Sequence, residues 1–166
     1  VWFVKSVDDV DRLFNEQLQK LQTDYVDFYL LHAMNLDRWK EMVDLGVVER
    51  LEELKAEGKI RYLGFSFHDS YQAFEEMLCA RDWDFCQIQL NYMDTNEQAG
   101  MKGYKLAEER NIPLVIMEPI KGGMLANVGA DIKKKFAELD PDASVASFAL
   151  RWVGTLPNIK VVLSGM

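Results

Sequence analysis

Polar side chains stand where short apolar runs of this sequence end, and they are the residues best placed to do chemistry. They are His32, Ser66, Asn91, Glu118 and Ser164. The apolar runs predict strands, and the carboxyl ends of parallel strands are where α/β proteins gather functional groups. His32 is the candidate catalytic residue, because a neutral imidazole can donate a hydrogen bond to a substrate oxygen. From position alone, a core histidine bonded to a neighbour is an equally good interpretation.

The elements that must position these side chains follow from the hydrophobic periodicity. Apolar residues three and four positions apart predict helices, and short apolar runs predict strands. The expected helices span 7–22, 45–57, 71–79, 98–110, 132–139 and 143–153, and the expected strands span 25–31, 60–67, 85–92, 114–117 and 159–163. We expect the strand 25–31 to be buried on both faces. Strands that alternate with helices indicate an α/β protein with a parallel sheet.

Two architectures fit this repeat, an open doubly wound sheet and a (β/α)8 TIM barrel. No Gly-x-Gly-x-x-Gly motif follows a strand and no Walker A pattern occurs, which counts against a Rossmann fold. The polar strand ends favour the barrel, which gathers such ends around one mouth. A complete barrel needs about 250 residues. We therefore expect residues 1–166 to be a single partial barrel domain that is truncated at both ends.

Composition excludes several classes of protein. The chain has 166 residues, with 27 acidic and 19 basic side chains and a formal net charge of −8. This acidic balance argues against nucleic-acid binding, and no apolar run approaches the roughly 18 residues that cross a membrane. Cys79 and Cys86 cannot form a metal site by themselves, and we expect both to be buried in a reducing compartment. We expect a cytoplasmic protein with no bound metal and no nucleic-acid or membrane partner.

Five segments of the sequence resemble the aldo-keto reductases. They are DYVDFYLLH (24–32), GKIRYLGFS (58–66), QIQLNY (87–92), IPLVIMEPIKGG (112–123) and ALRW (149–152) followed by VLSGM (162–166). The resemblance covers essentially the whole chain. It implies a (β/α)8 barrel, of which this chain holds strands four to eight, and an NADPH-dependent oxidoreductase that reduces an aldehyde or ketone to an alcohol.

Finer details resemble one branch of that family. The stretches GFSFH, MEPIKGG and VVLSGM are similar to bacterial and archaeal members, the longer of which carry a C-terminal ferredoxin-like iron–sulfur domain. No cluster-type run of cysteines occurs here, so an iron–sulfur cluster would belong to a full-length parent and not to this chain.

The resemblance also assigns the catalytic machinery. It makes His32 the catalytic histidine and places the family's Asp, Tyr and Lys before Val1. We therefore expect the isolated chain to be inactive and to need the rest of the parent barrel to complete its site. An open partial barrel would expose sheet edges and an apolar interior, so we expect poor solubility or oligomerisation. The alternative function is a regulatory or sensor subunit that binds a nicotinamide cofactor without catalysis.

Cofactor contacts come from the resemblance together with the chemistry of the residues. The predicted contacts are Ser66, Gln87, Met117, Glu118, Ile120, Lys121 and Gly122. The family resemblance implies that Ser66 and Gln87 hydrogen-bond to the carboxamide of the nicotinamide, although Phe67 stands where the family usually has Asn. It implies that Met117 packs on the nicotinamide ring, for which simple core packing is an equal alternative.

The loop that follows residues 114–117 is expected to approach the cofactor's pyrophosphate. Gly122 and Gly123 permit close backbone approach, and Lys121 can supply positive charge. Glu118 is unusual beside phosphates, since like charges repel, so we expect it to pair with Lys121 or with a basic residue outside this fragment. The preference for NADPH over NADH, the carbonyl substrate and the oligomeric state are not encoded in these residues.

Overall fold

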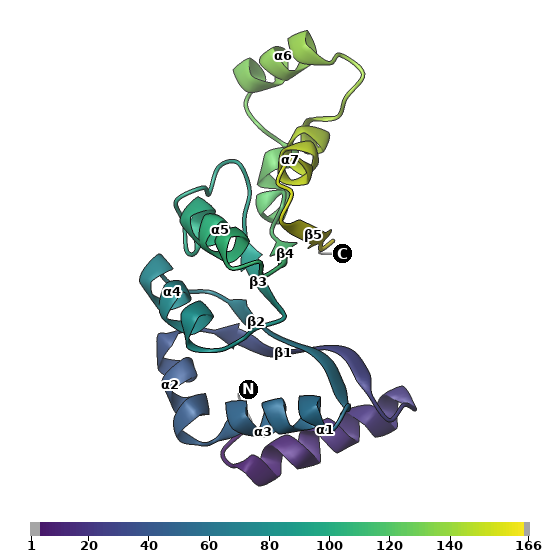
Figure 1. Cartoon of the computed structure of the whole chain (residues 1–166). Helices are drawn as coiled ribbons and strands as arrows, with labels where there is room; N and C mark the ends of the chain where they lie inside the picture. Colours follow the sequence, from purple (N-terminus) through teal and green to yellow (C-terminus); the bar gives the residue numbers. More distant parts are fainter. Residues whose placement is uncertain (1–3, 165–166) are drawn as a thin grey trace. The chain divides into compact units, whose positions relative to one another are not determined.

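The chain forms a parallel βα repeat in a computed structural model that describes residues 4–164 (Figure 1). The strands are β1 (Val26–Met34), β2 (Ile60–Phe67), β3 (Phe85–Gln89), β4 (Leu114–Met117) and β5 (Ile159–Val162). The helices are α1 (Val7–Leu21), α2 (Leu36–Asp44), α3 (Val47–Ala56), α4 (Tyr71–Ala80), α5 (Gly100–Glu109), the 3-10 helix η1 (Lys121–Ala126), α6 (Ala130–Leu139) and α7 (Val145–Gly154). Residues 1–3 and 165–166 lie outside the described residues.

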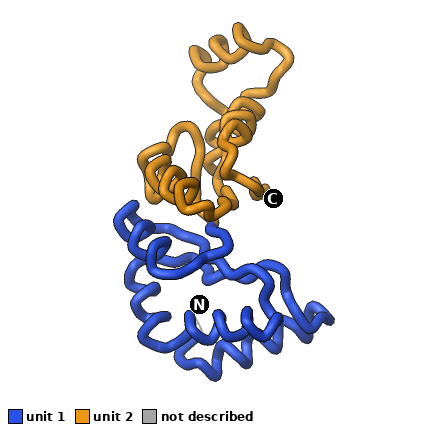
Figure 2. Tube along the Cα trace, viewed as in Figure 1, with its two compact units in different colours: residues 1–86 blue, residues 87–166 orange. Residues whose placement is uncertain are grey.

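The chain divides into two compact units, residues 1–86 and 87–166, which Figure 2 colours separately. In the first unit β1 pairs with β2 in parallel. The N–H of Asp84, just before β3, donates to the carbonyl oxygen of Leu63 in β2 at 3.0 Å. Neighbouring strands of this unit therefore follow the order of the chain.

The second unit continues the same pattern. The N–H of Leu90, just after β3, donates to the carbonyl oxygen of Met117 in β4 at 3.3 Å. Strand β4 in turn pairs with β5 in parallel. The predicted alternation of strands and helices is confirmed, whereas the single-domain interpretation stays a prediction.

Local chemistry explains where α1 begins. The side chain of Ser6 accepts a hydrogen bond from the N–H of Asp9, and the Asp9 carboxylate accepts one from the N–H of Lys5 at 3.0 Å. This reciprocal arrangement satisfies backbone donors that have no partner inside the helix.

The segment between β1 and β2 differs from the prediction. The sequence predicts one helix over 45–57, but the structure has α2 and α3, separated at Gly46 with φ +73°. Asn35 caps α2 by accepting from the N–H of Arg38 at 2.9 Å. Helix α2 is short, and its apolar side chains Trp39 and Met42 are buried. Leu36, Trp39 and Val43 lie at helical spacing, so the signal for this helix was present in the sequence and was overlooked.

The expectation that strand 25–31 is buried on both faces is wrong. Leu31 is buried, but Phe28 is 66% exposed. Leu31 pairs with Phe65 of β2, and helix α4 covers that side of the sheet through contact of the Phe65 and Phe74 rings. No described helix of the unit buries Phe28 on the other side, so one face of β1 is apolar and accessible.

The accessible face of the first unit carries an aromatic cluster on Phe28, Tyr62 and Phe85. Phe28 stacks on Tyr62 with a centroid distance of 5.0 Å and meets Phe85 edge-on at 5.5 Å. Gly64 makes room for this cluster, because a Cβ there would lie 2.5 Å from the Phe85 carbonyl oxygen and 2.8 Å from its ring.

The cysteines are only partly as expected. Cys86 is buried and burial raises the pKa of its thiol, whereas Cys79 is exposed on α4 rather than buried. Within residues 4–164, no helix is long and apolar enough to cross a membrane.

Gly64→Ala should destabilise the chain. The new methyl group would overlap backbone of Phe85 that cannot move freely, which costs about 1–3 kcal/mol of unfolding free energy. Urea unfolding followed by circular dichroism measures this. Gly154→Ala is the matched control, because a Cβ at Gly154 meets nothing within 4 Å. Equal unfolding midpoints for the two variants would contradict the prediction.

Candidate functional site

His32 lies at a bulge inside β1 rather than at the end of the strand. The pairing of β1 with β2 shifts between Leu31 and Met34. Ala33, the residue after His32, has φ +53°, in the left-handed region that non-glycine residues seldom occupy. Bulges add a residue to one strand and re-aim the side chains around it. The bulge therefore follows His32 directly.

Side chains hold the strained backbone of Ala33 from both ends. Its N–H donates to the hydroxyl oxygen of Ser66 in β2 at 2.7 Å, and its carbonyl oxygen accepts from the guanidinium of Arg38 in α2. Ser66 is only 1% exposed. Its oxygen therefore accepts the Ala33 hydrogen bond inside the protein.

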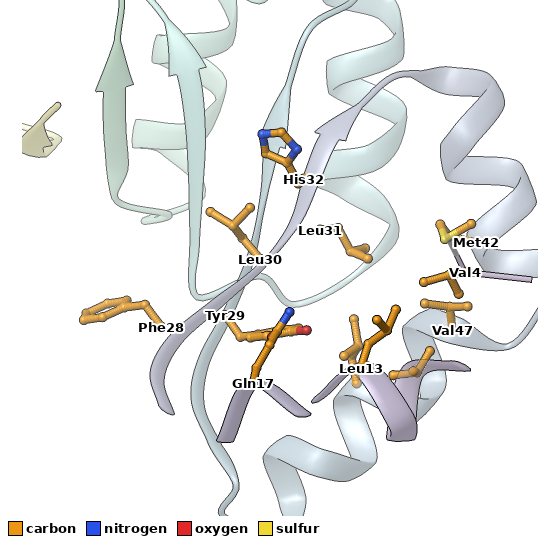
Figure 3. A pocket seen from close by; sticks show the side chains of 12 residues that line it. Val4, Leu13, Gln17, Phe28, Tyr29, Leu30, Leu31, His32, Met42 and Val47 are labelled. Carbon is orange, nitrogen blue, oxygen red and sulfur yellow. The ribbon is translucent and has the colours of Figure 1, made fainter. Parts of the chain in front are cut away.

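His32 is exposed and lines a cavity of about 350 Å³ in the first unit (Figure 3). Most of the other lining side chains are apolar and come from α1, β1, α2 and α3. Gln17 and Tyr29 are the other polar side chains of the lining. Figure 3 shows His32 and Leu30 on one side of β1 and Leu31 on the other. The histidine is thus accessible beside a largely apolar surface.

Phe67 and Trp39 belong to the core of the first unit. Phe67 is fully buried against the ring of Phe74, with a centroid distance of 5.2 Å. It therefore provides no replacement for the amide that the family usually has at its position. Trp39 packs edge-on against Trp83 at 5.9 Å.

In the second unit, the structure brings two predicted nicotinamide contacts together. The amide of Gln87 in β3 donates to the sulfur of Met117 in β4 at 3.5 Å. Both side chains are half-buried. An amide and a thioether side by side provide a polar donor and a polarisable surface, the two features that an aromatic carboxamide needs.

The loop after β4 is built from left-handed residues. Glu118 has φ +57°, Lys121 φ +50°, Gly122 φ +57° and Gly123 φ +90°. A Cβ at Gly123 would meet nothing within 4 Å. The two glycines thus leave open space along the loop and allow a ligand to approach the backbone closely.

This loop lines a pocket of about 500 Å³ within the second unit. The lining residues are Glu118, Pro119, Ile120, Gly122, Gly123, Leu150, Val162, Leu163 and Ser164. Three predicted cofactor contacts, Glu118, Ile120 and Gly122, are among them, and Lys121 is not. The open glycine backbone and the size of the pocket fit part of a nucleotide cofactor.

Lys121 pairs with a residue that the sequence analysis did not select. Its ammonium group binds the carboxylate of Asp94, which is 4% exposed, so the expected Glu118–Lys121 pair is wrong. The same carboxylate accepts from the Asn91 amide at 3.0 Å and the Gln89 amide at 3.1 Å. Asp94 is therefore the centre of a buried polar cluster below the loop.

Asn91 links this cluster to the loop. Its amide nitrogen also donates to the carbonyl oxygen of Glu118 at 3.2 Å. Its side-chain oxygen accepts from the N–H groups of Met93 and Asp94, both at 3.0 Å. This turn ends β3 at Gln89, short of the predicted end of the strand at residue 92.

The electrostatics of Asp94 follow from its partners. Burial alone would raise the pKa of the carboxyl, but the hydrogen bonds from Lys121, Asn91 and Gln89 and the charge of Lys121 outweigh it and lower the pKa. The carboxylate is thus ionised in the native state across the neutral range.

Asp94 and Arg38 are the residues that sequence reasoning missed. An Asn followed three residues later by Asp after a strand is a recognisable turn signal. No sequence signal pairs Asp94 with Lys121 or Arg38 with the backbone of Ala33. Among the described residues, no group of three or more His, Cys, Asp or Glu side chains could hold a metal ion.

Comparison with known proteins places the chain. Residues 5–166 match the model of the aldo/keto reductase family. The chain is 25% identical over 171 aligned positions to the uncharacterised oxidoreductase YqkF of Bacillus subtilis, covering 90% of this chain and 53% of that protein. It is 29% identical over 139 positions to a glyoxal reductase of the same organism, covering 84% of this chain and 46% of that protein.

A solved structure agrees with this match. The holo form of an aldo-keto reductase, AKR11C1 from Bacillus halodurans, superposes with a TM-score of 0.80 at 26% identity, and the match covers 100% of this chain and 59% of that one. This chain belongs to the aldo/keto reductase family. Its parallel strands and helices correspond to part of the family's TIM barrel, which confirms the predicted fold class. The chain spans about half the length of the curated relatives it matches.

Ser66→Ala should lower stability. The N–H of Ala33 would lose its acceptor at a backbone position that is already strained, at a cost of about 1–3 kcal/mol. Urea unfolding measures the change, and Ser164→Ala is the control because Ser164 is exposed. An unfolding free energy equal to that of the wild-type chain would show that the Ser66 hydroxyl does not hold the bulge.

The contribution of Asp94 to stability should depend on pH in the acid range. Because the native pKa of Asp94 lies below its ordinary value of 3.8, the stabilisation is complete above that value and is lost as the pH falls through the lowered native pKa. The difference in unfolding free energy between the wild type and Asp94→Asn should therefore shrink below about pH 4. Asp131→Asn, at an exposed carboxylate on α6, is the control for loss of a carboxylate at the surface. A difference that stays constant into strong acid would contradict the prediction.

Proposed function

We propose that this chain provides the catalytic histidine and the cofactor-binding residues of an NADPH-dependent aldo-keto reductase that reduces an aldehyde or ketone to an alcohol. The observation that carries the proposal is the bulge of β1, which presents an exposed His32 directly before the Ala33 backbone held by Ser66. Family membership supplies the class of reaction, and the similarity to a glyoxal reductase supports a small carbonyl substrate.

His32 acts on the oxygen of the carbonyl group in this proposal. Bound NADPH would supply hydride chemistry at the carbonyl carbon. As negative charge develops on the oxygen, a neutral imidazole donates a hydrogen bond to it and orients the substrate. We assign the acid–base Asp, Tyr and Lys of the family to the rest of the barrel, and we propose that the chain alone is inactive.

The cofactor is assigned to the remaining predicted residues. The hydroxyl of Ser66 and the amide of Gln87 would bind the carboxamide, and Met117 would pack on the nicotinamide ring. Glu118, Ile120, Lys121 and Gly122 belong to the loop assigned to the pyrophosphate. Family membership, rather than a contact within either unit, assigns these residues to one cofactor.

The partners follow from the same proposal. We infer a small carbonyl substrate and the complementary strands of the barrel as partners, with no nucleic acid and no membrane, in a cytoplasmic protein. The exposed apolar side chains of Phe28 and Tyr62 in the first unit are a surface that complementary strands would cover. We further assign the chain to the branch of the family whose longer members carry an iron–sulfur domain.

The isolated chain should bind NADPH without consuming it. Quenching of tryptophan fluorescence measures binding, and loss of NADPH absorbance with glyoxal as the probe measures turnover. His32→Ala should bind NADPH as the wild type does, because the imidazole is assigned to the substrate. Failure of the wild-type chain to bind NADPH would contradict the proposed function, and turnover that is lost in His32→Ala would contradict its inactivity alone.

A chimera separates an enzyme from a regulatory subunit. The first three βα units of the Bacillus subtilis glyoxal reductase, joined to this chain, should restore glyoxal reduction. His32→Ala in the chimera should lower kcat by about a hundredfold or more, the lower end of the range for loss of a donor to a developing oxyanion. A chimera that folds and binds NADPH but shows no turnover would favour the regulatory subunit.

A further inference from the structure

The buried cluster around Asp94 has a fixed direction of hydrogen bonding. A carboxylate only accepts hydrogen bonds, so the Gln89 amide must turn its nitrogen toward Asp94. The oxygen of Gln89 then accepts from the Gln98 amide nitrogen at 2.9 Å. Ionised Asp94 thus orders a chain of side chains that reaches from the loop after β4 to the start of α5.

The cluster around Asp94 binds the loop after β4 at the two non-glycine residues of the loop that have a strained backbone. Glu118 and Lys121 both have positive φ, a conformation that persists only where the surroundings impose it. The carbonyl oxygen of Glu118 accepts from Asn91, and the ammonium group of Lys121 binds Asp94. Asn91 itself donates to Asp94, so both restraints converge on one carboxylate.

The same contacts direct Lys121 away from the pocket. Its side chain is 34% exposed and that of Asp94 is 5% exposed, so the pair is shielded on the carboxylate's side. The pocket of about 500 Å³ is lined by the loop residues on both sides of Lys121 but not by Lys121. The positive charge of Lys121 is therefore paired with Asp94.

We propose that Asp94 is a positioning residue, which holds Lys121 and fixes the Glu118–Gly123 loop in the left-handed conformation that gives the pocket its affinity for the cofactor. Lys121 acts through the shape of the loop, in place of the direct phosphate contact that the sequence predicts. The identity of the ligand rests on the proposed function, whereas the restraint on the loop does not.

This role and a direct phosphate contact by Lys121 predict opposite effects of removing the carboxylate. If Lys121 binds phosphate in competition with Asp94, then Asp94→Asn frees the ammonium group and tightens NADPH binding. If Asp94 positions the loop, then Asp94→Asn loosens the loop and weakens binding. The sign of the change in affinity distinguishes them.

Two measurements on the 166-residue chain test the proposal, hydrogen exchange of the Gly122–Ala126 amides without ligand and fluorescence titration with NADPH. Asp94→Asn should lower amide protection and NADPH affinity by about tenfold each, the change expected when a charge-assisted hydrogen bond is lost. Lys121→Arg should keep both, because it keeps the ion pair. The double variant Asp94→Asn/Lys121→Met should bind NADPH no more weakly than either single variant, because each substitution removes the same Lys121–Asp94 ion pair.

Asp131→Asn is the matched control and should change neither measurement. Lys121→Met removes the same ion pair by changing its more exposed partner. This variant serves as the test if Asp94→Asn fails to fold. Unchanged loop protection in a folded Asp94→Asn chain, or tighter NADPH binding, would overturn the proposal. If the loop loosens as expected but the wild type binds no NADPH, the proposed function fails and the positioning of the loop stands.

Discussion

The structure depends on one constraint, which is that backbone groups at left-handed positions near strand ends need hydrogen-bond partners. In each unit, side chains from outside the strained segment provide them. Ser66 of β2 accepts from the N–H of Ala33 in β1, and Asn91 after β3 donates to the carbonyl oxygen of Glu118 after β4. A buried backbone group without a partner costs as much as a lost hydrogen bond. These bonds therefore determine which loop conformations the fold accepts.

This constraint links packing to chemistry. The bulge at Ala33 costs backbone energy and directly follows His32, which is exposed while the neighbouring Leu31 is buried. The loop after β4 has a similarly strained backbone at Glu118, and its glycines line a pocket. Strained backbone that persists near candidate functional groups is the expected signature of preorganisation.

Much of the fold was predictable because its signals are local. The Ser6 and Asp9 cap marks the start of α1, and the run that ends at Met117 marks β4. Helix α2 was overlooked although Leu36, Trp39 and Val43 lie at helical spacing. The exposure of Phe28 was missed because an apolar run does not say which faces of a strand are covered. Coverage is a property of the helices that pack nearby, so it is not contained in the run.

The sequence by itself determined the order of strands and helices, the family and the residue types at the strand ends, including His32, Gln87 and the glycine pair of the loop. The tertiary structure alone decided which partners the polar side chains bind. Ser66 meets Ala33 across a separation of 33 residues, and Lys121 meets Asp94 across 27. Such partners are chosen by strand register and loop conformation, which no local pattern of residues specifies.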